Sequence, residues 1–392
     1  MQPQSRLRNP AVVPVVRVLI AAAITAAAGC SSTTGPSEVA HGPRTYVVDP
    51  SGAGDFVRIQ EALNAVADGD TVLLLPGAYS GPGNKNLTII GVSPVIMGLG
   101  DRDITVIDCD ESGRGFYIGS GAAPVIENLT ITNGDTLRGG GMYLESASPS
   151  LRNVRFRYNR TSEQGGEGAG IYCRNGSPAL SDVLFDHNYA DGSGGGMQCV
   201  GTLGTPALND VVFYDNTAQG SGGGMSCFFS APALSGCVFW KNASAFGAGI
   251  YCNTASPAVT NCTFAENEGQ LGGGIFMEGN SSPTILNSII AFSTYGQPME
   301  CEGGSTPFTT RCCIYGNVGG NALCGDYSTS MLRVDPLFCD VLLGDLTLRA
   351  DSPCLPENNP WGVLIGAYGQ GCDFLEAVAG HPSWGTIKSL FR

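Results

Sequence analysis

The chain has 392 residues, with 20 lysines and arginines against 34 aspartates and glutamates, so its formal net charge is −14. So acidic a chain is a poor partner for nucleic acid or for an anionic lipid surface, because both carry negative charge themselves. The 57 glycines and 23 prolines, with only 14% charged residues, are typical of short strands joined by tight turns.

The N-terminus, residues 1–29, reads as an export signal. Three arginines, Arg6, Arg8 and Arg17, precede an apolar run at 18–29 that is too short to span a bilayer as a permanent helix, so we expect cleavage. The small residues directly before Cys30 resemble the lipobox of bacterial lipoproteins. The resemblance implies a lipid on Cys30 and a place in the cell envelope, as an outer-membrane lipoprotein; the alternative is ordinary cleavage and secretion.

A polar linker at 30–44 leads into residues 45–110, which we expect to form an N-terminal cap and the first coils of an array. Apolar residues at helical spacing over 59–66 predict a short amphipathic helix. Such a helix would cover the apolar end of a stack of repeats. This segment resembles the N-terminal entry of pectin-lyase-like β-helices.

Residues 111–320 repeat one pattern: a Gly-rich step, a hydrophobic pair, a Ser-Pro or Ala-Pro step, a short apolar run and then F-x-x-N. The prolines from Pro124 to Pro307 recur at steps of 24–29 residues. That period suits a solenoid coil and is too short for propeller blades or helical hairpins. Apolar alternation over three or four residues leaves room only for strands. We therefore predict an all-β, single-domain parallel β-helix.

The alternating GG-[AG]-[IM] and F-x-x-N steps resemble the repeats of the polymorphic outer membrane proteins, which are cell-surface β-helices implicated in adhesion. The resemblance implies a right-handed β-helix. It also implies a role in surface binding. Beyond the repeats we expect closing coils at 321–372 and a tail at 373–392.

When the coils are aligned on their prolines, like residues fall into columns, which parallel stacking would place one interstrand distance apart. Phenylalanines are expected to fill the interior, and asparagines to pair at a bend. Cysteines form two further columns, where they serve as small buried fillers or as disulfides between coils. A bridge is more expected among Cys339, Cys354 and Cys372 near the C-terminus, whereas the spacing of cysteines and histidines argues against structural zinc. The two main columns are Phe156, Phe185, Phe213, Phe239 and Phe264, and Asn159, Asn188, Asn216, Asn242 and Asn267.

The outward residues beside the Gly steps suggest a binding stripe. If they face solvent, their rings could stack on sugars; if a loop covers them, they are part of the packing. Tyr214 and Trp240 suggest a second contact on another face. The stripe consists of Tyr117, Tyr143, Tyr172, Tyr251 and Phe276.

The sequence lacks the catalytic strings of pectin methylesterases and polygalacturonases, so no catalytic residue is transferred from them. Four carboxylates, Asp182, Asp186, Asp210 and Asp215, are the alternative catalytic group, able to shift one another's pKa or to attract Ca²⁺. Solvated turn residues are the simpler explanation of the same four. No other cofactor is indicated.

Three functions remain open. The first is an exported cell-envelope module for surface binding or adhesion, with a polysaccharide or another cell-surface ligand as its partner. The second, from a different class, is a lyase, hydrolase or esterase acting on uronate-type glycans. The third is a purely structural envelope protein.

Overall fold

The computed structural model describes residues 42–201, 203–327 and 329–373. The predicted signal, Cys30 and the tail beyond Asp373 lie outside these described residues, so their predictions stay as stated.

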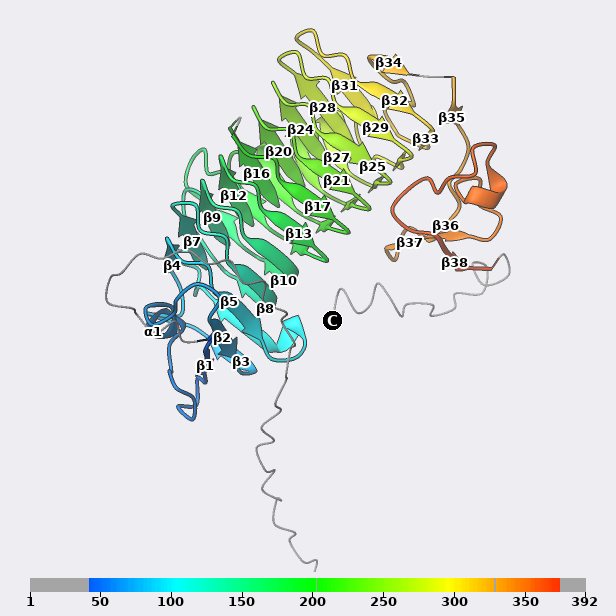
Figure 1. The fold of residues 1–392 in the computed structure, drawn as a ribbon. Coiled ribbons are helices and arrows are strands. Elements are labelled where there is room, and N and C mark those ends of the chain that lie inside the picture. Colours follow the sequence, from blue (N-terminus) through cyan, green and yellow to red (C-terminus); the bar gives the residue numbers. More distant parts are fainter. Residues whose placement is uncertain (1–41, 202, 328, 374–392) are drawn as a thin grey trace, which may run out of the picture. The chain divides into compact units, whose positions relative to one another are not determined.

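The body of the protein is a stack of coils, each built from short strands that pair in parallel with the next coil (Figure 1). One coil contains β13 (Ala179–Ser181), β14 (Leu184–Asp186), β15 (Tyr189–Ala190) and β16 (Met197–Val200). The next coil repeats these as β17 (Ala207–Asn209), β18 (Val212–Tyr214), β19 (Thr217–Ser221) and β20 (Met225–Phe228), in register. The predicted parallel β-helix is confirmed.

The strands align into three parallel sheets along the stack. The first, with 21 strands, also holds β1 (Thr45–Val48), β2 (Thr71–Leu74), β3 (Gly77–Tyr79), β5 (Val95–Gly98), β6 (Thr105–Asp108), β8 (Val125–Thr132), β10 (Ser150–Arg157), β21 (Ala233–Ser235), β22 (Val238–Trp240), β25 (Ala258–Thr260), β26 (Thr263–Ala265), β29 (Thr284–Leu286), β30 (Ile289–Ala291), β32 (Phe308–Thr310), β33 (Cys312–Tyr315), β34 (Asp326–Tyr327) and β35 (Met331–Leu332). The second, with nine strands, adds to β16 and β20 the strands β4 (Leu87–Ile90), β7 (Phe116–Gly119), β9 (Met142–Glu145), β12 (Ile171–Arg174), β24 (Ile250–Asn253), β28 (Ile275–Glu278) and β31 (Met299–Cys301). The third, with five strands, adds to β15 and β19 the strands β11 (Arg160–Thr161), β23 (Ala243–Phe246) and β27 (Glu268–Leu271).

A short helix, α1 (Ile59–Leu63), lies at the N-terminal end of the stack, as the sequence predicts, although it is shorter than the expected 59–66. Its apolar side chains Ile59, Ala62 and Leu63 are buried in the same core as the strands. The helix therefore supplies the polar outer face that a terminal repeat needs.

Phenylalanine rings fill the interior as predicted. Successive rings from Phe156 to Phe264 stack nearly parallel, with centroids 5.1, 4.8, 4.7 and 4.7 Å apart, close to the interstrand spacing. All five rings are buried. The column is thus a continuous aromatic stack along the coils.

The buried asparagines form a hydrogen-bonded ladder at the bend after this column. Asn216 shows the pattern: its Oδ1 accepts from the backbone N and Nδ2 of Asn188, at 3.1 and 2.8 Å. Its Nδ2 donates to the Phe185 carbonyl at 2.9 Å and to Asn242 Oδ1 at 3.0 Å. Each amide thus satisfies polar groups that have no access to water. The predicted structural role of the column is confirmed.

Left-handed backbone turns mark the corners of every coil. A second column of asparagines and aspartates, at the bend before strands such as β14 and β18, has positive φ throughout, including 52° at Asp182 and 54° at Asp210. Asparagine and aspartate tolerate this conformation better than most residues, which explains their recurrence there. The column consists of Asn128, Asn153, Asp182, Asp210, Asn261 and Asn287.

Most described cysteines are buried free thiols, in agreement with the alternative that they act as small buried side chains in the packing. Cys173, Cys199, Cys227 and Cys252 lie in register on successive strands without bridging. Two disulfides form near the C-terminus, Cys301–Cys324 and Cys339–Cys372, with Cα atoms 5.8 and 6.0 Å apart. The second lies where a bridge was expected, whereas Cys301 bridges to Cys324 instead of to a column neighbour.

The C-terminal segment differs from the expected closing coils of 321–372. After β34 and β35 the chain leaves the stack and forms a separate sheet of β36 (Phe338–Asp340), β37 (Asp345–Arg349) and β38 (Gln370–Cys372), with the 3₁₀ helix η2 (Pro356–Asn358) between the last two. This C-terminal cap (336–373) packs on outward residues of the first sheet. The buried contacts include Leu184, Val238 and Ile289 from the coils and Leu348 and Ile365 from the cap.

Replacing Asn216 by alanine tests the ladder. The change leaves the buried backbone N–H of Asn188 without its acceptor and removes one donor each from the Phe185 carbonyl and Asn242 Oδ1, so we expect a loss of about 2–4 kcal/mol in unfolding free energy. Denaturant unfolding followed by circular dichroism measures it. The matched control is Asn209→Ala, an exposed asparagine on β17, for which we expect a change within about 0.5 kcal/mol. Equal effects of the two changes would contradict the ladder's role.

Candidate functional site

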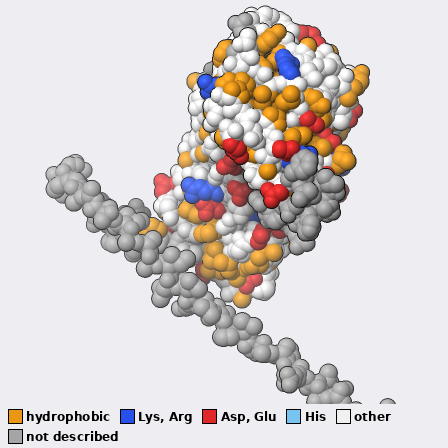
Figure 2. All heavy atoms as spheres, turned by 90° about the vertical axis from the view of Figure 1, so that its right-hand side faces the viewer, with side chains coloured by type: hydrophobic (Ala, Val, Ile, Leu, Met, Phe, Trp, Pro, Cys, Tyr) orange, Lys and Arg blue, Asp and Glu red, His pale blue; other side chains and the backbone are white. Residues whose placement is uncertain are grey.

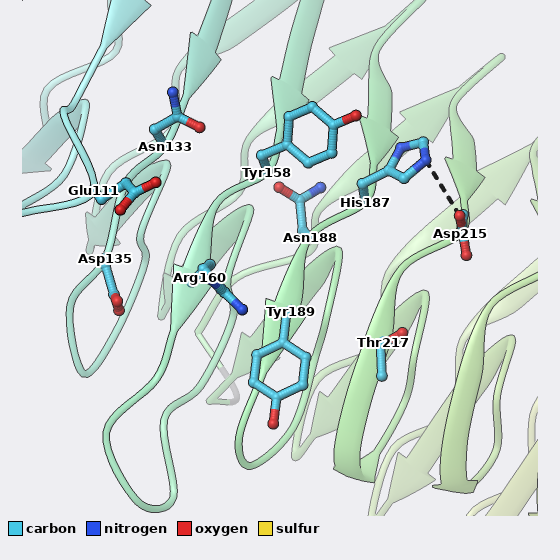
Figure 3. Close-up of a pocket in the computed structure, with 11 residues that line it drawn as sticks. Glu111, Asn133, Asp135, Tyr158, Arg160, His187, Asn188, Tyr189, Asp215 and Thr217 are labelled. Carbon is cyan, nitrogen blue, oxygen red and sulfur yellow. Dashed lines mark ion pairs between the residues drawn. The ribbon is translucent and has the colours of Figure 1, made fainter.

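A hollow of about 460 Å³ opens on the outer surface where the first sheet turns into the third sheet (Figure 3). Residues from successive coils line it, so it follows the stacking direction. The lining is mixed aromatic, charged and amide: Glu111, Asn133, Gly134, Asp135, Tyr158, Arg160, His187, Asn188, Tyr189, Asp215 and Thr217.

The corner before the third sheet positions three of these side chains. Tyr158, His187 and Asp215 occupy the same place in successive coils, between the Phe and the Asn of the F-x-x-N step, with φ of 52°, 56° and 52°. Tyr158 and His187 lie with ring centroids 5.1 Å apart. A left-handed residue at a tight corner turns its side chain away from the packed interior. The corner therefore presents one variable side chain per coil.

These rings begin an aromatic row along the stack. The His187 ring meets Tyr214 edge-on at 5.2 Å, and Tyr214 stacks on Trp240 at 4.5 Å. Trp240 is buried next to Gly344 of the C-terminal cap. The second contact predicted at Tyr214 and Trp240 thus leads away from the hollow and ends beneath the cap.

His187 is held between two carboxylates. Its Nδ1 lies 3.0 Å from Asp186 Oδ2, and its Nε2 lies 3.2 Å from Asp215 Oδ2. The imidazole side chain is partly exposed, with 30% of its surface accessible. A histidine fixed at both nitrogens has its ring orientation set before any ligand arrives.

Asp186 is a buried structural carboxylate. Its oxygens accept hydrogen bonds from Arg155 at 2.7 and 3.0 Å, and Arg157 lies 3.1 Å away. Burial alone would raise the pKa of Asp186, but the hydrogen bonds from His187 and Arg155 and the two arginine charges outweigh it and lower the pKa. The carboxylate therefore stays charged and anchors His187.

Arg160 and Tyr189 form the other wall. They lie in register on β11 and β15, directly after the ladder asparagines, and the guanidinium lies 5.7 Å from the centre of the Tyr189 ring. Arg160 is exposed and Tyr189 is half-buried. A guanidinium at the surface can donate hydrogen bonds to sugar hydroxyls, and an aromatic ring can stack on the C–H face of a sugar.

The predicted stripe from Tyr117 to Phe276 lies on the second sheet. The prediction that its side chains face solvent is wrong for three of them. Tyr172, Tyr251 and Phe276 are only 4, 6 and 1% exposed. Tyr117 and Tyr143 are half-buried. The alternative stated with the prediction, that these rings are part of the packing, holds for the three buried ones.

Arginines and the Gly steps supply the cover. The guanidinium of Arg138 lies 5.3 Å above the Tyr172 ring, and a Cβ on Gly168 would come within 2.9 Å of Tyr172 Cβ. Burial and the hydrogen bond from its hydroxyl to Glu145 raise the pKa of Tyr143 to about 12. The second sheet thus has its aromatic side chains already engaged.

The four carboxylates of the catalytic alternative do not meet at one place. Asp182 and Asp210 lie at the bend before β14 and β18, whereas Asp186 and Asp215 meet at His187 beyond the other end of these strands. Burial raises the pKa of Asp182, the Arg102 charge lowers it and the Asp210 charge raises it further, with a net increase. Only Asp215 of the four lines the hollow.

Sequence reasoning missed Tyr158, Arg160, His187 and Tyr189. A usable signal existed in the F-x-x-N step: the residue before the Asn and the residue after it vary from coil to coil, while Phe and Asn recur. Positions that vary inside a strict repeat are the exposed ones.

The described residues contain neither a group of metal ligands nor a membrane-spanning helix. In that part of the chain, no three histidine, cysteine or carboxylate side chains are grouped so that they could hold a metal ion. Over the same ranges, no helix has the length and apolar character needed to cross a membrane.

The chain matches the family model described as "Right handed beta helix region" over residues 96–264 and again over 182–314, together more than half of its length. It belongs to the right-handed β-helix family. A comparison with curated protein sequences found no significant match.

Solved structures with related folds include lyases. This β-helix protein is similar to pectate lyase Pel9A, with 13% identity and a TM-score of 0.45, over 83% of this chain and 96% of that chain. It is also similar to a mannuronic acid specific polysaccharide family 6 lyase from human gut microbiota, with 12% identity and a TM-score of 0.36, over 74% and 83% of the two chains. At these identities the likeness concerns the fold and says nothing of activity.

The Asp186 network predicts an acid-sensitive contribution to stability. Because the folded-state pKa is lowered, the contribution is present above the unfolded pKa of about 3.9 and is lost as the pH falls through the folded value. We expect Asp186→Asn to cost about 3–5 kcal/mol at pH 7 and progressively less as the pH falls below about 3.9, measured by denaturant unfolding over a series of pH values. The control is the exposed Asp210→Asn, and a pH-independent cost of Asp186→Asn would contradict the assignment.

Proposed function

We propose that this protein is a glycan-binding module of the cell envelope. The observation that carries the proposal is the hollow of about 460 Å³, in which Tyr158 and Tyr189 stand beside Arg160, His187 and Asp215. Sugar rings offer C–H faces to aromatic rings and hydroxyls to charged and amide groups, so this mixture suits a saccharide. Tyr158 is 44% exposed, although the Arg157 guanidinium lies 4.5 Å from the centre of its ring.

Short corners around the hollow favour binding over catalysis. Only His187 and Asn188 separate β14 from β15, and only Asp215 and Asn216 separate β18 from β19. Corners of this length cannot build the walls that exclude water from a reacting group. A surface that holds a polymer while leaving it open to solvent is what adhesion requires.

A second candidate function, a polysaccharide-active enzyme, has one observation in its favour. His187 is fixed between Asp186 and Asp215 and lies on the hollow, an arrangement that could move a proton to or from a bound sugar. Asp215 would then orient the imidazole at Nε2 and release it on substrate binding. We rank it second because the hollow stays open.

Binding to a panel of neutral and uronate oligosaccharides, measured by calorimetry, tests the proposal. We expect Tyr158→Ala combined with Tyr189→Ala to weaken binding about tenfold or more, because both aromatic side chains that line the hollow are lost. The control is Tyr327→Ala, which removes a ring that is 53% exposed away from the hollow. Unchanged binding in the double variant would contradict the site.

The same panel separates the two candidate functions. Binding without product formation supports the module. Turnover that is lost in His187→Gln, with folding intact, would replace the module by the enzyme.

The location in the envelope rests on Cys30 and on the resemblance of the repeats to the polymorphic outer membrane proteins. We expect radioactive palmitate to label the full-length protein in a bacterial host and Cys30→Ser to abolish the label. Labelling that persists in Cys30→Ser, or export of an unlabelled soluble product, would contradict the anchor.

A further inference from the structure

A second hollow, of about 390 Å³, continues the first along the third sheet. Its lining includes Thr217, Ala243, Glu268 and Tyr295. Thr217 also lines the first hollow, so the two hollows lie next to each other at this residue. Together they reach from Glu111 to Tyr295.

One in-register column runs through both hollows. Parallel pairing aligns its members one per coil: Asp135, Arg160, Tyr189, Thr217, Ala243, Glu268 and Tyr295. The first four line the first hollow and the last four line the second, with Thr217 in both. Six interstrand steps make a path of about 29 Å at 4.7–4.9 Å per step. A path of this length suits a chain of linked units better than a single small molecule.

The side chains in this column differ in size along the path. Thr217 and Ala243, in the middle, are small, whereas Tyr189 and Tyr295 lie on either side of them. The two rings are four coils apart, about 19 Å. Tyr295 is 55% exposed. A ligand that reaches both rings must be extended along the stacking direction.

Charge on the path selects against anionic polymers. The two linings contain the carboxylates Glu111, Asp135, Asp215 and Glu268 but one arginine, Arg160. His187 is matched by Asp215 at 3.2 Å, and Asp135 accepts hydrogen bonds from the Ser162 backbone and hydroxyl at 3.0 and 2.6 Å.

The charge of the whole chain has the same sign. The whole chain has a formal charge of −14, and acidic side chains outnumber basic ones on the face drawn in Figure 2. A polyuronate, with a carboxylate on each unit, would meet repulsion along most of the path.

We propose that the ligand is a linear, uncharged polysaccharide that lies along the stacking direction across both hollows. This inference rests on the proposed glycan-binding function and names its ligand class. Tyr189 and Tyr295 stack on sugar rings near the two ends of the bound segment. Thr217 and Ala243 leave room for the units between them.

The test uses the full chain with two series of oligosaccharides of increasing length, one neutral and β-linked and one of uronate units. We expect neutral oligomers to bind more tightly as they lengthen, and uronates of equal length to bind at least tenfold more weakly. We expect Ala243→Phe to weaken binding of long neutral oligomers at least tenfold, because the ring fills the middle of the path. The matched control is Ala258→Phe, which places the same ring on an exposed alanine of β25 in the first sheet.

Tyr295→Ala provides a second variant that leaves the middle of the path unchanged. We expect it to weaken the binding of long oligomers and to leave unchanged the binding of short ones that occupy only the first hollow. This inference would be overturned if uronates bound more tightly than neutral oligomers, or if Ala243→Phe and Tyr295→Ala both bound long neutral oligomers as tightly as the unchanged protein. Either result would leave glycan binding in place. If neither series binds, the proposed function itself fails.

Discussion

In-register parallel pairing between coils, one interstrand distance apart, is the constraint on which the rest of the structure depends. It places each residue directly against its counterparts in the coils before and after it. A buried amide such as Asn188 is therefore tolerable only because Asn159 and Asn216 are there to complete its hydrogen bonds. A buried ring such as Phe213 likewise has parallel rings on both faces. Interior positions must repeat.

The same constraint acts in the opposite sense on charges at the surface. Identical charges repeated every 4.7–4.9 Å would repel, so charged columns alternate in sign or mix with rings. The positions just before the ladder asparagines, which continue from Tyr158, His187 and Asp215 to Lys241 and Glu266, show this. Asp215 lies 3.2 Å from the His187 ring, and Lys241 pairs with Glu266 at 3.7 Å. Variation along an outward column is thus a requirement of stacking. It also provides the chemical diversity from which a binding site can be assembled.

Those two consequences explain what could be predicted from the sequence. Repetition identified the parallel β-helix, the Phe stack and the Asn ladder, because interior columns must recur. Exposure of the outward columns was not predictable in the same way. Tyr172 and His187 are both outward residues of a repeat, but Arg138 and the backbone at Gly168 cover the first, which is 4% exposed, whereas 30% of the second side chain stays accessible between Tyr158 and Tyr214. The residues that bury an outward side chain come from neighbouring coils and loops. Aligning one column of the repeat does not show which residues these are.

The position of the candidate site follows from which outward faces are already occupied. Loops and arginines engage the aromatic side chains of the second sheet, and the cap covers Leu184, Val238 and Ile289 on the first. The cap segment has apolar residues at strand-like spacing, as further coils would, so the sequence alone could not reveal that it turns back. Its docking buries an apolar strip that water would otherwise contact, which stabilises the coils beneath it. On the third sheet, by contrast, Thr217 and Ala243 are small and the neighbouring corners are two residues long. The surface there remains hollow because neither side chains nor loops are large enough to fill it.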